Sequence, residues 1–302
     1  MSAAGVSIEM TRSAGDSERF ARDSSFAIMV NGLPGAMASE VARVVVERGL
    51  TLAPKALTGP SVPASSAKFG EAAVELVAPD SAEDALMDML AKYPSLICID
   101  YTHPSSANPN AALYARLGVS YIMGTTGGDE AKMRADLTDS AAFALIAPNM
   151  GKQIVAFQAA MRIMAEQFPG AFRGYSLKVT ESHQSTKADT SGTAKAVVAS
   201  LNAMGAGPLE VSEIEKLRTA SESIGRLGVP EEAVNSGHAF HTYRLESADG
   251  TVAFEFKHNV VGRRVYAEGT VDAALFLAER RAASDSQRVF NMIDVLRAGA
   301  MR

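Results

Sequence analysis

The residues whose types and spacing could do chemistry are concentrated between Glu181 and Lys195, in the run ESHQSTKADTSGTAK. His183 can give up a proton near neutral pH, and Lys187, four residues later, supplies a positive charge. The Ser-Gly-Thr turn at 191–193 opens a predicted helix, whose first N–H groups and positive dipole end suit a carboxylate. The segment therefore predicts acid catalysis on an anionic small molecule, although a surface loop with an ordinary helix cap has the same composition.

A second candidate site begins where the first apolar run ends, with the turn Gly32-Leu33-Pro34-Gly35. The two glycines would let the backbone approach a pyrophosphate, and the helix that follows would direct its free N–H groups at it. An ordinary strand-to-helix turn is the alternative. The position of the turn between a predicted strand and a predicted helix favours a dinucleotide cofactor.

The end of the second predicted strand, Thr51–Leu57, bears on which dinucleotide is used. An acid at this point usually binds the ribose 2′-hydroxyl of NAD, whereas this chain continues as Thr58-Gly59 without Asp or Glu. Since no carboxylate would repel a 2′-phosphate, NADP is allowed. Thr58 and a cation that the sequence does not identify could hold the phosphate; the alternative is a loop that faces water.

Two further loops follow predicted strands at the same edge of the sheet. GTTGG at 124–128 comes after Val119–Met123, and APNM at 147–150 comes after a strand that begins at Phe143. Their small residues would let backbone and hydroxyl groups line a planar ring, although plain turns are the alternative. His103, which follows another strand, is interpreted as a solvent-facing loop residue.

The elements that must position these residues change in character at Asn149. Before it, strands and helices alternate, with a strand expected at Val74–Val77 and a helix at Ala82–Lys92, which predicts a Rossmann-type parallel sheet with helices on both faces. After it, the pattern is α+β with a mixed or antiparallel sheet: a helix is expected at Lys152–Gln167, a loop from His183, and strands at His238–Ser247, Thr251–His258 and Arg263–Glu268. The last helices are expected at Thr270–Ala282 and Gln287–Arg297. We expect a mobile tail at 1–25, a dinucleotide-binding domain at 26–150 that also takes the helices in 270–302, and a substrate-binding and oligomerisation domain at 151–269.

Composition excludes several classes of protein. The 302 residues are 47% hydrophobic, enough to bury a sizeable core, and 29 Lys+Arg against 34 Asp+Glu disfavour a nucleic-acid-binding surface. The single cysteine, Cys98, excludes an internal disulfide and indicates a reducing compartment. Apolar runs are too short for a membrane span, and the first residues lack an apolar signal core. His238 and His241 lie in a predicted strand and are interpreted as packing residues, so no metal is expected.

Several motifs together resemble the dihydrodipicolinate reductases (4-hydroxy-tetrahydrodipicolinate reductases), which transfer a hydride in the diaminopimelate route to lysine. The motifs occur in the family's order over about residues 26–302. Segments such as ESHQ and NMIDVLRAGAMR are similar to the plant-like branch of the family. The motifs that carry the resemblance are Gly32-x-x-Gly35 with Met37, Asp100-Tyr101-Thr102-x-Pro104, Gly124-Thr125-Thr126-Gly127, Asn149-Met150-Gly151-Lys152, the His183 segment and Tyr266-Ala267-x-Gly269.

The resemblance implies roles for individual residues. His183 is the implied proton donor and Lys187 the second catalytic group, while Gly192 and Thr193 would hold a substrate carboxylate. Gln184 stands where bacterial members commonly have a second histidine; it can hydrogen-bond the substrate but carries no charge. The candidate cofactor-binding residues are Gly32, Gly35, Met37, Thr58, Thr102, Gly124, Thr125, Thr126, Pro148, Asn149 and Met150.

The expected reaction is hydride transfer from NADPH, or less preferentially NADH, to a ring carbon of a dehydrated cyclic dicarboxylate held between the two halves. His183 would protonate the neighbouring carbon, giving tetrahydrodipicolinate. The resemblance also implies a homodimer or homotetramer. The plastid stroma of a photosynthetic eukaryote and a bacterial cytoplasm would both suit the missing disulfides, and the source would decide between them. Two alternatives stay open: another two-domain NAD(P) dehydrogenase of an amino-acid pathway, and a non-catalytic NADP-binding regulator.

Overall fold

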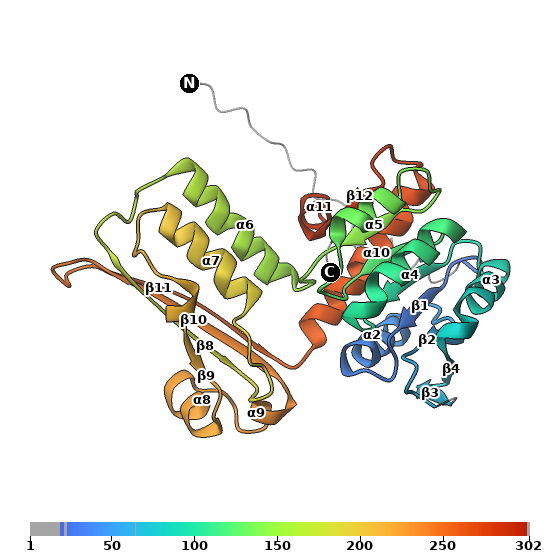
Figure 1. Cartoon of the computed structure of the whole chain (residues 1–302), viewed down its shortest axis with the longest axis horizontal. Coiled ribbons are helices and arrows are strands. Elements are labelled where there is room, and N and C mark those ends of the chain that lie inside the picture. Colours follow the sequence, from blue (N-terminus) through green and yellow to red (C-terminus); the bar gives the residue numbers. More distant parts are fainter. Residues whose placement is uncertain (1–18, 21–22, 64, 301–302) are drawn as a thin grey trace. The chain divides into compact units, whose positions relative to one another are not determined.

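The structure is a computed structural model that describes residues 19–20, 23–63 and 65–300. The chain divides into two compact units, which Figure 1 shows as ribbons. The first unit extends to Gly151 and resumes at Tyr266, and the second unit comprises Lys152–Val265. Residues 1–18 and 21–22, which belong to the predicted mobile tail, lie outside the described residues.

The first unit is built on a five-stranded parallel sheet in the order β1-β5-β6-β7-β12. The residues of the four longer strands are buried, as continuous apolar runs are in a parallel sheet covered on both faces. The Rossmann-type prediction is therefore confirmed. The strands are β1 (Ile28–Asn31), β5 (Ile97–Asp100), β6 (Ser120–Met123), β7 (Ala144–Ile146) and β12 (Val289–Phe290).

Helices complete this unit. α3, α4 and α5 share one apolar cluster with the sheet, to which Leu86, Tyr114 and Met133 contribute. On α10, nearly every residue from Ala267 to Ala278 is buried. The helices are α2 (Ala36–Glu47), α3 (Ala82–Lys92), α4 (Pro104–Leu117), α5 (Glu130–Asp136), α10 (Arg264–Ala282) and α11 (Met292–Arg297), with a 3₁₀ turn η1 (Pro79–Ser81) before α3.

A small second sheet differs from the expected arrangement. The strands predicted around Leu57 and Val77 do not join the parallel sheet but form β2 (Lys55–Leu57) and β4 (Ala72–Val77), which pair with β3 (Ser66–Phe69). β3 is antiparallel to β4 and alternates polar and apolar residues, because one of its faces meets solvent. The sequence analysis did not predict β3.

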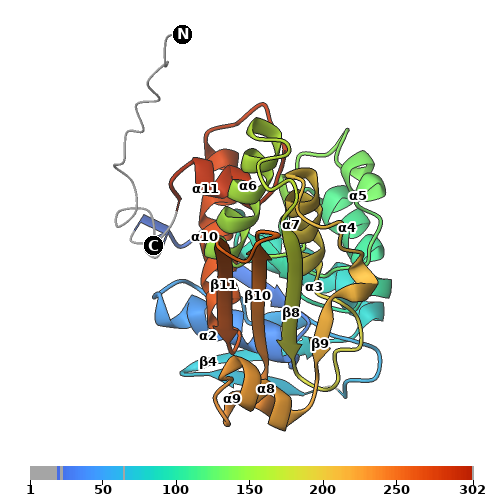
Figure 2. The same ribbon diagram turned by 90° about the vertical axis from the view of Figure 1, so that its left-hand side faces the viewer.

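The second unit contains a four-stranded mixed sheet in the order β11-β10-β8-β9, whose strands lie side by side in Figure 2. β10 runs antiparallel to β8 and β11, whereas β8 and β9 are parallel. α6 and α7 pack on one face around Tyr243, and α9 packs on the other around Phe240. The elements are α6 (Lys152–Gln167), β8 (Ser176–His183), α7 (Gly192–Ala203), a 3₁₀ turn η2 (Val211–Glu213), β9 (Glu215–Leu217), α8 (Ala220–Leu227), α9 (Ala233–Ser236), β10 (His238–Glu246) and β11 (Ala253–Val261).

Three local predictions are wrong. Arg263–Glu268 was predicted as a strand, but helix α10 begins at Arg264; the strand formers Val265 and Tyr266 lie in its first turn, and the buried helical run follows without a break. β12 lies inside the helix predicted at Gln287–Arg297, and α11 begins only after Asn291, which caps it. His183, predicted to start a loop, is the last residue of β8 and pairs with Ala239 of β10.

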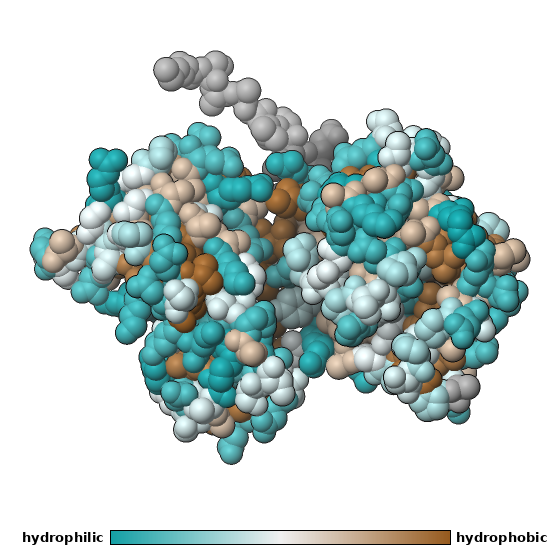
Figure 3. Space-filling view, viewed as in Figure 1, coloured by the Kyte–Doolittle hydropathy of each residue, from teal (hydrophilic) through white to brown (hydrophobic). Residues whose placement is uncertain are grey.

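The surface is mixed in character. Figure 3 shows hydrophilic side chains over much of the visible face, with smaller hydrophobic areas between them. The large apolar side chains with the greatest exposure include Phe168, Met87 and Ile163. Within the described residues, the helices are too short or too polar to cross a membrane.

Candidate active site

The loops that follow β1, β5 and β6 meet around Tyr101. Gly32 has φ +102°, and a side chain there would collide with the Tyr101 carbonyl group. A side chain at Gly124 would collide with the Tyr101 ring, whose hydroxyl lies 2.7 Å from Thr270 Oγ1 of α10. Gly35 is the N-cap of α2, so the helix N-terminus follows the glycine turn directly. This backbone arrangement fits the pyrophosphate of a dinucleotide cofactor.

Asp100 connects these loops. It lies at the end of β5 and is fully buried. Its Oδ1 accepts hydrogen bonds from the N–H of Thr102 (3.1 Å), from the hydroxyl of Thr102 (2.7 Å) and from the hydroxyl of Thr125 (2.7 Å). Its Oδ2 accepts from Asn110 Nδ2 (2.9 Å) and from the Tyr114 hydroxyl (2.8 Å). Because an ionised carboxylate only accepts, the surrounding donors all converge on it and fix the loops that carry them.

The Asp100 network continues toward β1 and β2. Asn31 Nδ2 donates to the Tyr114 hydroxyl oxygen at 2.8 Å, and Asn31 Oδ1 accepts the N–H of Leu57 at 2.8 Å. Loops from β1, β2, β5 and β6 are thus held by one set of hydrogen bonds. No role was predicted for Asn31, Asp100 or Tyr114. Asn31 and Asp100 are polar residues at the ends of two buried apolar strands, and this position could have indicated them.

Thr58 is buried, so the water-facing alternative is wrong for this residue. Its hydroxyl donates a hydrogen bond to the Leu33 carbonyl at 2.6 Å, which ties the turn after β2 to the glycine turn. The nearby cation Lys55 has its Nζ 2.7 Å from Asp88 Oδ2. A 2′-phosphate at Thr58 would therefore compete with Leu33 for the hydroxyl hydrogen.

The remaining cofactor candidates differ in exposure. Met150 is buried, with 2% of its surface exposed. Asn149 Oδ1 accepts the N–H of Gly151 at 2.8 Å, which shapes the loop after β7. The exposed or half-exposed candidates are Gly32, Gly35, Met37, Thr102, Gly124, Thr125, Thr126, Pro148 and Asn149.

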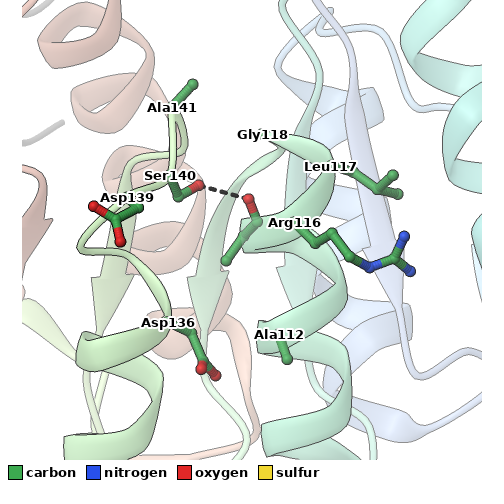
Figure 4. A pocket seen from close by; sticks show the side chains of 9 residues that line it. Ala112, Arg116, Leu117, Gly118, Asp136, Asp139, Ser140 and Ala141 are labelled. Carbon is green, nitrogen blue, oxygen red and sulfur yellow. Dashed lines mark hydrogen bonds between the residues drawn. The ribbon is translucent and has the colours of Figure 1, made fainter.

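A cavity of about 510 Å³ lies elsewhere in the first unit. Its walls include Gly118, which precedes β6, and Ser140, which precedes β7, so it lies at the amino ends of these strands. Figure 4 shows the Ser140 hydroxyl hydrogen-bonded into the wall, where it donates to the Ala115 carbonyl at 2.6 Å. Cofactors bind parallel sheets beyond the carboxyl ends of the strands, so we do not assign the cofactor to this cavity.

In the second unit, both ring nitrogens of His183 face protein atoms. Nδ1 lies 3.1 Å from the His238 carbonyl oxygen, and Nε2 lies 3.3 Å from Nε2 of His241. Both residues are buried, and His183, at 7% exposed, is more accessible than His241, at 2%. His241, interpreted from sequence as a packing residue, thus also contacts the proposed proton donor.

The predicted substrate-binding residues surround the loop after β8. Lys187 Nζ pairs with Asp189 at 2.9 Å and keeps part of its side chain exposed. Gln184 is half-exposed. Gly192 and Thr193 are the first two residues of α7, so their N–H groups lie at the positive end of the helix, and Ser191 is its N-cap. The structure therefore places a cation and a helix N-terminus in one loop, as a carboxylate site requires.

Glu181 and Arg218 brace this loop. Arg218 Nη2 donates to the buried Glu181 carboxylate, and Arg218 Nε donates to the Lys187 carbonyl at 2.7 Å. Arg218 Nη2 also lies 3.3 Å from the Asp189 carbonyl. Glu181 Oε2 in turn accepts the N–H of Ser191 at 3.0 Å. One ion pair thus connects the strand of His183 to the segment that carries Lys187 and to the start of α7, a role that sequence analysis did not detect.

Electrostatics keep the two histidines neutral in the unliganded protein. Burial, followed by the charges of Arg218 and Lys187, lowers the pKa of His183 to about 3. Burial and the neighbouring His258 lower the pKa of His241 well below its ordinary value. At neutral pH each ring therefore has one N–H group and one lone pair.

Glu181, His183 and His241 also bring one potential ligand atom each to within 4.8 Å of one another. Such atoms can bind a metal ion. The Glu181 carboxylate, however, is engaged by Arg218 and by the Ser191 N–H, and the positive charges of Arg218 and Lys187 oppose a cation. We therefore interpret these residues as a hydrogen-bond network.

Comparison with known families covers both units. Residues 26–150 match the family model described as "Dihydrodipicolinate reductase, N-terminus", and residues 153–296 match "Dihydrodipicolinate reductase, C-terminus". Together the two matches include the loops around Tyr101 and the His183 segment.

Named relatives agree with these matches. A probable 4-hydroxy-tetrahydrodipicolinate reductase 2, chloroplastic, from Oryza sativa subsp. japonica is 48% identical over 92% of this chain and 85% of its own length. The chloroplastic reductase 2 of Arabidopsis thaliana is also 48% identical, over 91% of this chain and 78% of its own. A bacterial reductase from Gluconacetobacter diazotrophicus is 34% identical over 72% of this chain and 83% of its own.

A solved structure has a similar fold. The dipicolinate-bound dihydrodipicolinate reductase from Paenisporosarcina sp. TG-14 gives a TM-score of 0.58 and covers 88% of this chain and 96% of its own. Its sequence identity to this chain is 16%, so the likeness concerns the fold alone.

Proposed function

Because the chain belongs to the dihydrodipicolinate reductase family, we propose that His183 and Lys187 carry its reaction. The protein is an NAD(P)H-dependent oxidoreductase of lysine and diaminopimelate biosynthesis, and it reduces 4-hydroxy-tetrahydrodipicolinate to tetrahydrodipicolinate. The observation that carries the residue assignment is the segment from the end of β8 to the start of α7, which contains His183, Lys187 and a helix N-terminus.

The substrate is a cyclic dicarboxylate, and the proposed contacts match its charges. Lys187 takes one carboxylate, which replaces the Asp189 side chain as its ionic partner. The N–H groups of Gly192 and Thr193 receive a carboxylate at the N-terminus of α7, and Gln184 hydrogen-bonds from the adjacent loop. The solved structure from Paenisporosarcina holds dipicolinate, which is also a cyclic dicarboxylate; this supports the class of ligand and not the individual contacts.

The role of His183 depends on these charges. Its pKa of about 3 in the unliganded protein keeps it neutral at pH 7. The positive charges of Lys187 and Arg218 help to lower that pKa. A bound dicarboxylate offsets these charges, so substrate binding raises the pKa of His183. His183 takes up a proton from water at Nε2, because Nδ1 already donates to the His238 carbonyl oxygen, and then gives that proton to the carbon next to the one that is reduced. When bound, the nicotinamide cofactor supplies the hydride.

For the cofactor, we propose NADPH in preference to NADH. The support is the turn after β2, where Thr58, Gly59, Pro60 and Ser61 include no carboxylate that would repel a 2′-phosphate. Gly32, Gly35, Thr102, Thr125 and the backbone at 148–150 complete the proposed cofactor contacts.

Assembly and location are also proposed from the family resemblance. We propose a homodimer or homotetramer, which light scattering of the purified chain would distinguish from a monomer. The names of the rice and Arabidopsis relatives place them in the chloroplast, so we propose the plastid stroma if the source is photosynthetic and the cytoplasm if it is bacterial.

The test is the absorbance change of NADPH oxidation with enzymatically generated 4-hydroxy-tetrahydrodipicolinate. His183→Gln should lower kcat by about 10²–10⁴-fold with a smaller change in substrate KM, because a general acid acts in the transition state. Lys187→Ala should lower kcat and raise KM. NADPH should give a higher kcat/KM than NADH.

Unchanged turnover in His183→Gln would remove its assignment as the acid. Tight NADPH binding without hydride transfer in a single turnover would instead favour a non-catalytic regulator. Normal affinity and rate in Lys187→Ala would remove the second assignment.

A further inference from the structure

His241 lies in a polar row that crosses the second unit's sheet. Its register partners are Glu181 on β8 and His258 on β11. The His241 ring stacks on His258 with 4.5 Å between centroids, and Phe157 of α6 covers His258 at 5.6 Å. His241 is therefore enclosed on the helix-covered face of the sheet, where it contacts protein atoms.

The His238 carbonyl determines which His183 nitrogen carries hydrogen. A carbonyl oxygen only accepts, so Nδ1 of His183, 3.1 Å away, must be the N–H group. In the neutral ring, Nε2 of His183 is then a lone pair. Nε2 of His241, at 3.3 Å, is accordingly the donor of the second hydrogen bond.

These two hydrogen bonds fix the His183 ring from both sides. The His238 bond alone would allow the ring to swing about Nδ1, whereas the His241 bond restrains the opposite nitrogen. Glu181 Oε2 lies 3.9 Å from Nε2 of His241, beyond a hydrogen bond, and is engaged by the Ser191 N–H. Thus His241 donates to His183 without competition from the carboxylate.

We propose that His241 is a positioning residue, whose Nε2–H group holds the neutral His183 ring in place until Nε2 of His183 takes up the proton that it passes to substrate. This inference rests on the proposed function, in which His183 is the general acid. It adds a residue that sequence analysis treated as packing and that lies 58 positions further along the chain than His183.

Two substitutions of His241 separate positioning from packing. His241→Gln keeps an amide N–H near the place of Nε2, whereas His241→Phe keeps a ring against His258 and Tyr243 but loses the donor. If His241 only packs, Phe should preserve function better than Gln, because it buries apolar surface without a polar group. If it positions His183, Gln should preserve kcat better than Phe, even where Phe gives the higher Tm.

The expected result is a kcat for His241→Phe that is lower by about 10- to 100-fold, as misplacement of a catalytic group produces. KM for the dicarboxylate and for NADPH should stay near the wild-type values, and His241→Gln should recover most of the loss. The matched control is His258→Phe, which alters the other ring in the stack and should leave kcat near the wild-type value.

Wild-type kcat in His241→Phe, together with loss of kcat in His183→Gln, would overturn this inference and leave the proposed function intact. Wild-type kcat in His183→Gln would overturn the proposed function itself. If His241→Phe does not fold, His241→Asn replaces it. The amide of the shorter asparagine side chain reaches the place of Nδ1 and not that of Nε2, so it does not restore the hydrogen bond to His183. Equal kcat values for His241→Asn and His241→Gln would then contradict the proposal. Loss of wild-type activity after dialysis against EDTA, restored by Zn²⁺, would also overturn it in favour of a metal at Glu181, His183 and His241.

Discussion

Each unit holds a fully buried carboxylate near the end of a strand that leads into candidate site loops: Asp100 in the first unit and Glu181 in the second. Asp100 accepts hydrogen bonds from hydroxyl, amide and N–H groups, which are neutral. Glu181 is paired with the guanidinium group of Arg218 and lies beside His241. The two carboxylates perform the same task, holding several loops, with different chemistry.

The difference matches the proposed roles of the two sites. In the proposed function, the first unit binds a cofactor through backbone groups, which requires rigid loops and no change of protonation. The second unit would hold a dianionic substrate and move a proton, and its loops carry the cations Lys187 and Arg218 close to His183. Neutral hydrogen bonds suffice for the first task, whereas the second needs charges that respond to the ligand.

Removing the charge of Glu181 should give the largest stability effect. Glu181→Gln leaves Arg218, which is 18% exposed, without its anionic partner, and should lower the free energy of unfolding by about 3–5 kcal/mol. Chemical denaturation measures this value. The matched control is Glu215→Gln, whose pair with Arg226 is 35–45% exposed and should cost at most about 1 kcal/mol. Equal losses of unfolding free energy in Glu181→Gln and Glu215→Gln would contradict the role of Glu181 in holding the loop after β8.

Asp100→Asn should affect the other unit. The new amide places a donor among donors, and the network should lose about 1–3 kcal/mol. Because Asp100 holds the loops of the proposed cofactor site, we expect the same loss in the free energy of NADPH binding. The NADPH Kd then rises by about 5- to 150-fold, while the Kd for dipicolinate stays unchanged. Fluorescence titration measures the first and calorimetry the second. Ser140→Ala, at the opposite end of the sheet, is the control. An equal rise in the Kd values for NADPH and dipicolinate would show that Asp100 and Glu181 do not serve separate sites.

Acid should destabilise the second unit first. Four of the chain's five histidines lie there, and burial lowers the pKa of His183 to about 3 and that of His258 to about 4. Because the unfolded chain binds protons near pH 6.5 and the folded unit does not, stability falls as the pH drops from about 6.5 toward 4. Each such histidine contributes a slope of up to about 1.4 kcal/mol per pH unit.

Amide hydrogen exchange read by mass spectrometry would resolve the two units over this pH range. Protection should decline in residues 152–265 before the first unit, where the histidine His103 is exposed. His258→Phe should reduce the slope. A parallel decline in both units would contradict the proposed difference.

Elements with a clear helical period were predictable to the residue. α3 (Ala82–Lys92) and α6 (Lys152–Gln167) match the expected helices, because their apolar residues recur at helical spacing and proline follows within two residues of each end. The body of α10 was also expected as a helix, at Thr270–Ala282, whereas its start at Arg264 was predicted as part of a strand.

In the candidate site, the residues of one continuous segment were predictable, whereas their partners on other strands were not. His183, Lys187 and the start of α7 form one continuous segment, so their composition predicted a carboxylate site. Their partners come from other strands: Arg218 lies 37 residues beyond Glu181, and His241 lies 58 beyond His183. Such pairs depend on the register between β8, β9 and β10, which a single sequence does not encode as a local pattern.

The first unit is made from two separate stretches of chain, with the whole second unit inserted between them. Its core includes α10, whose buried residues are synthesised only after the second unit has been completed. On the ribosome, residues 152–265 can therefore finish their sheet while the N-terminal half still lacks a covering helix and strand β12. The part of the protein that is translated first is the part that completes its fold last.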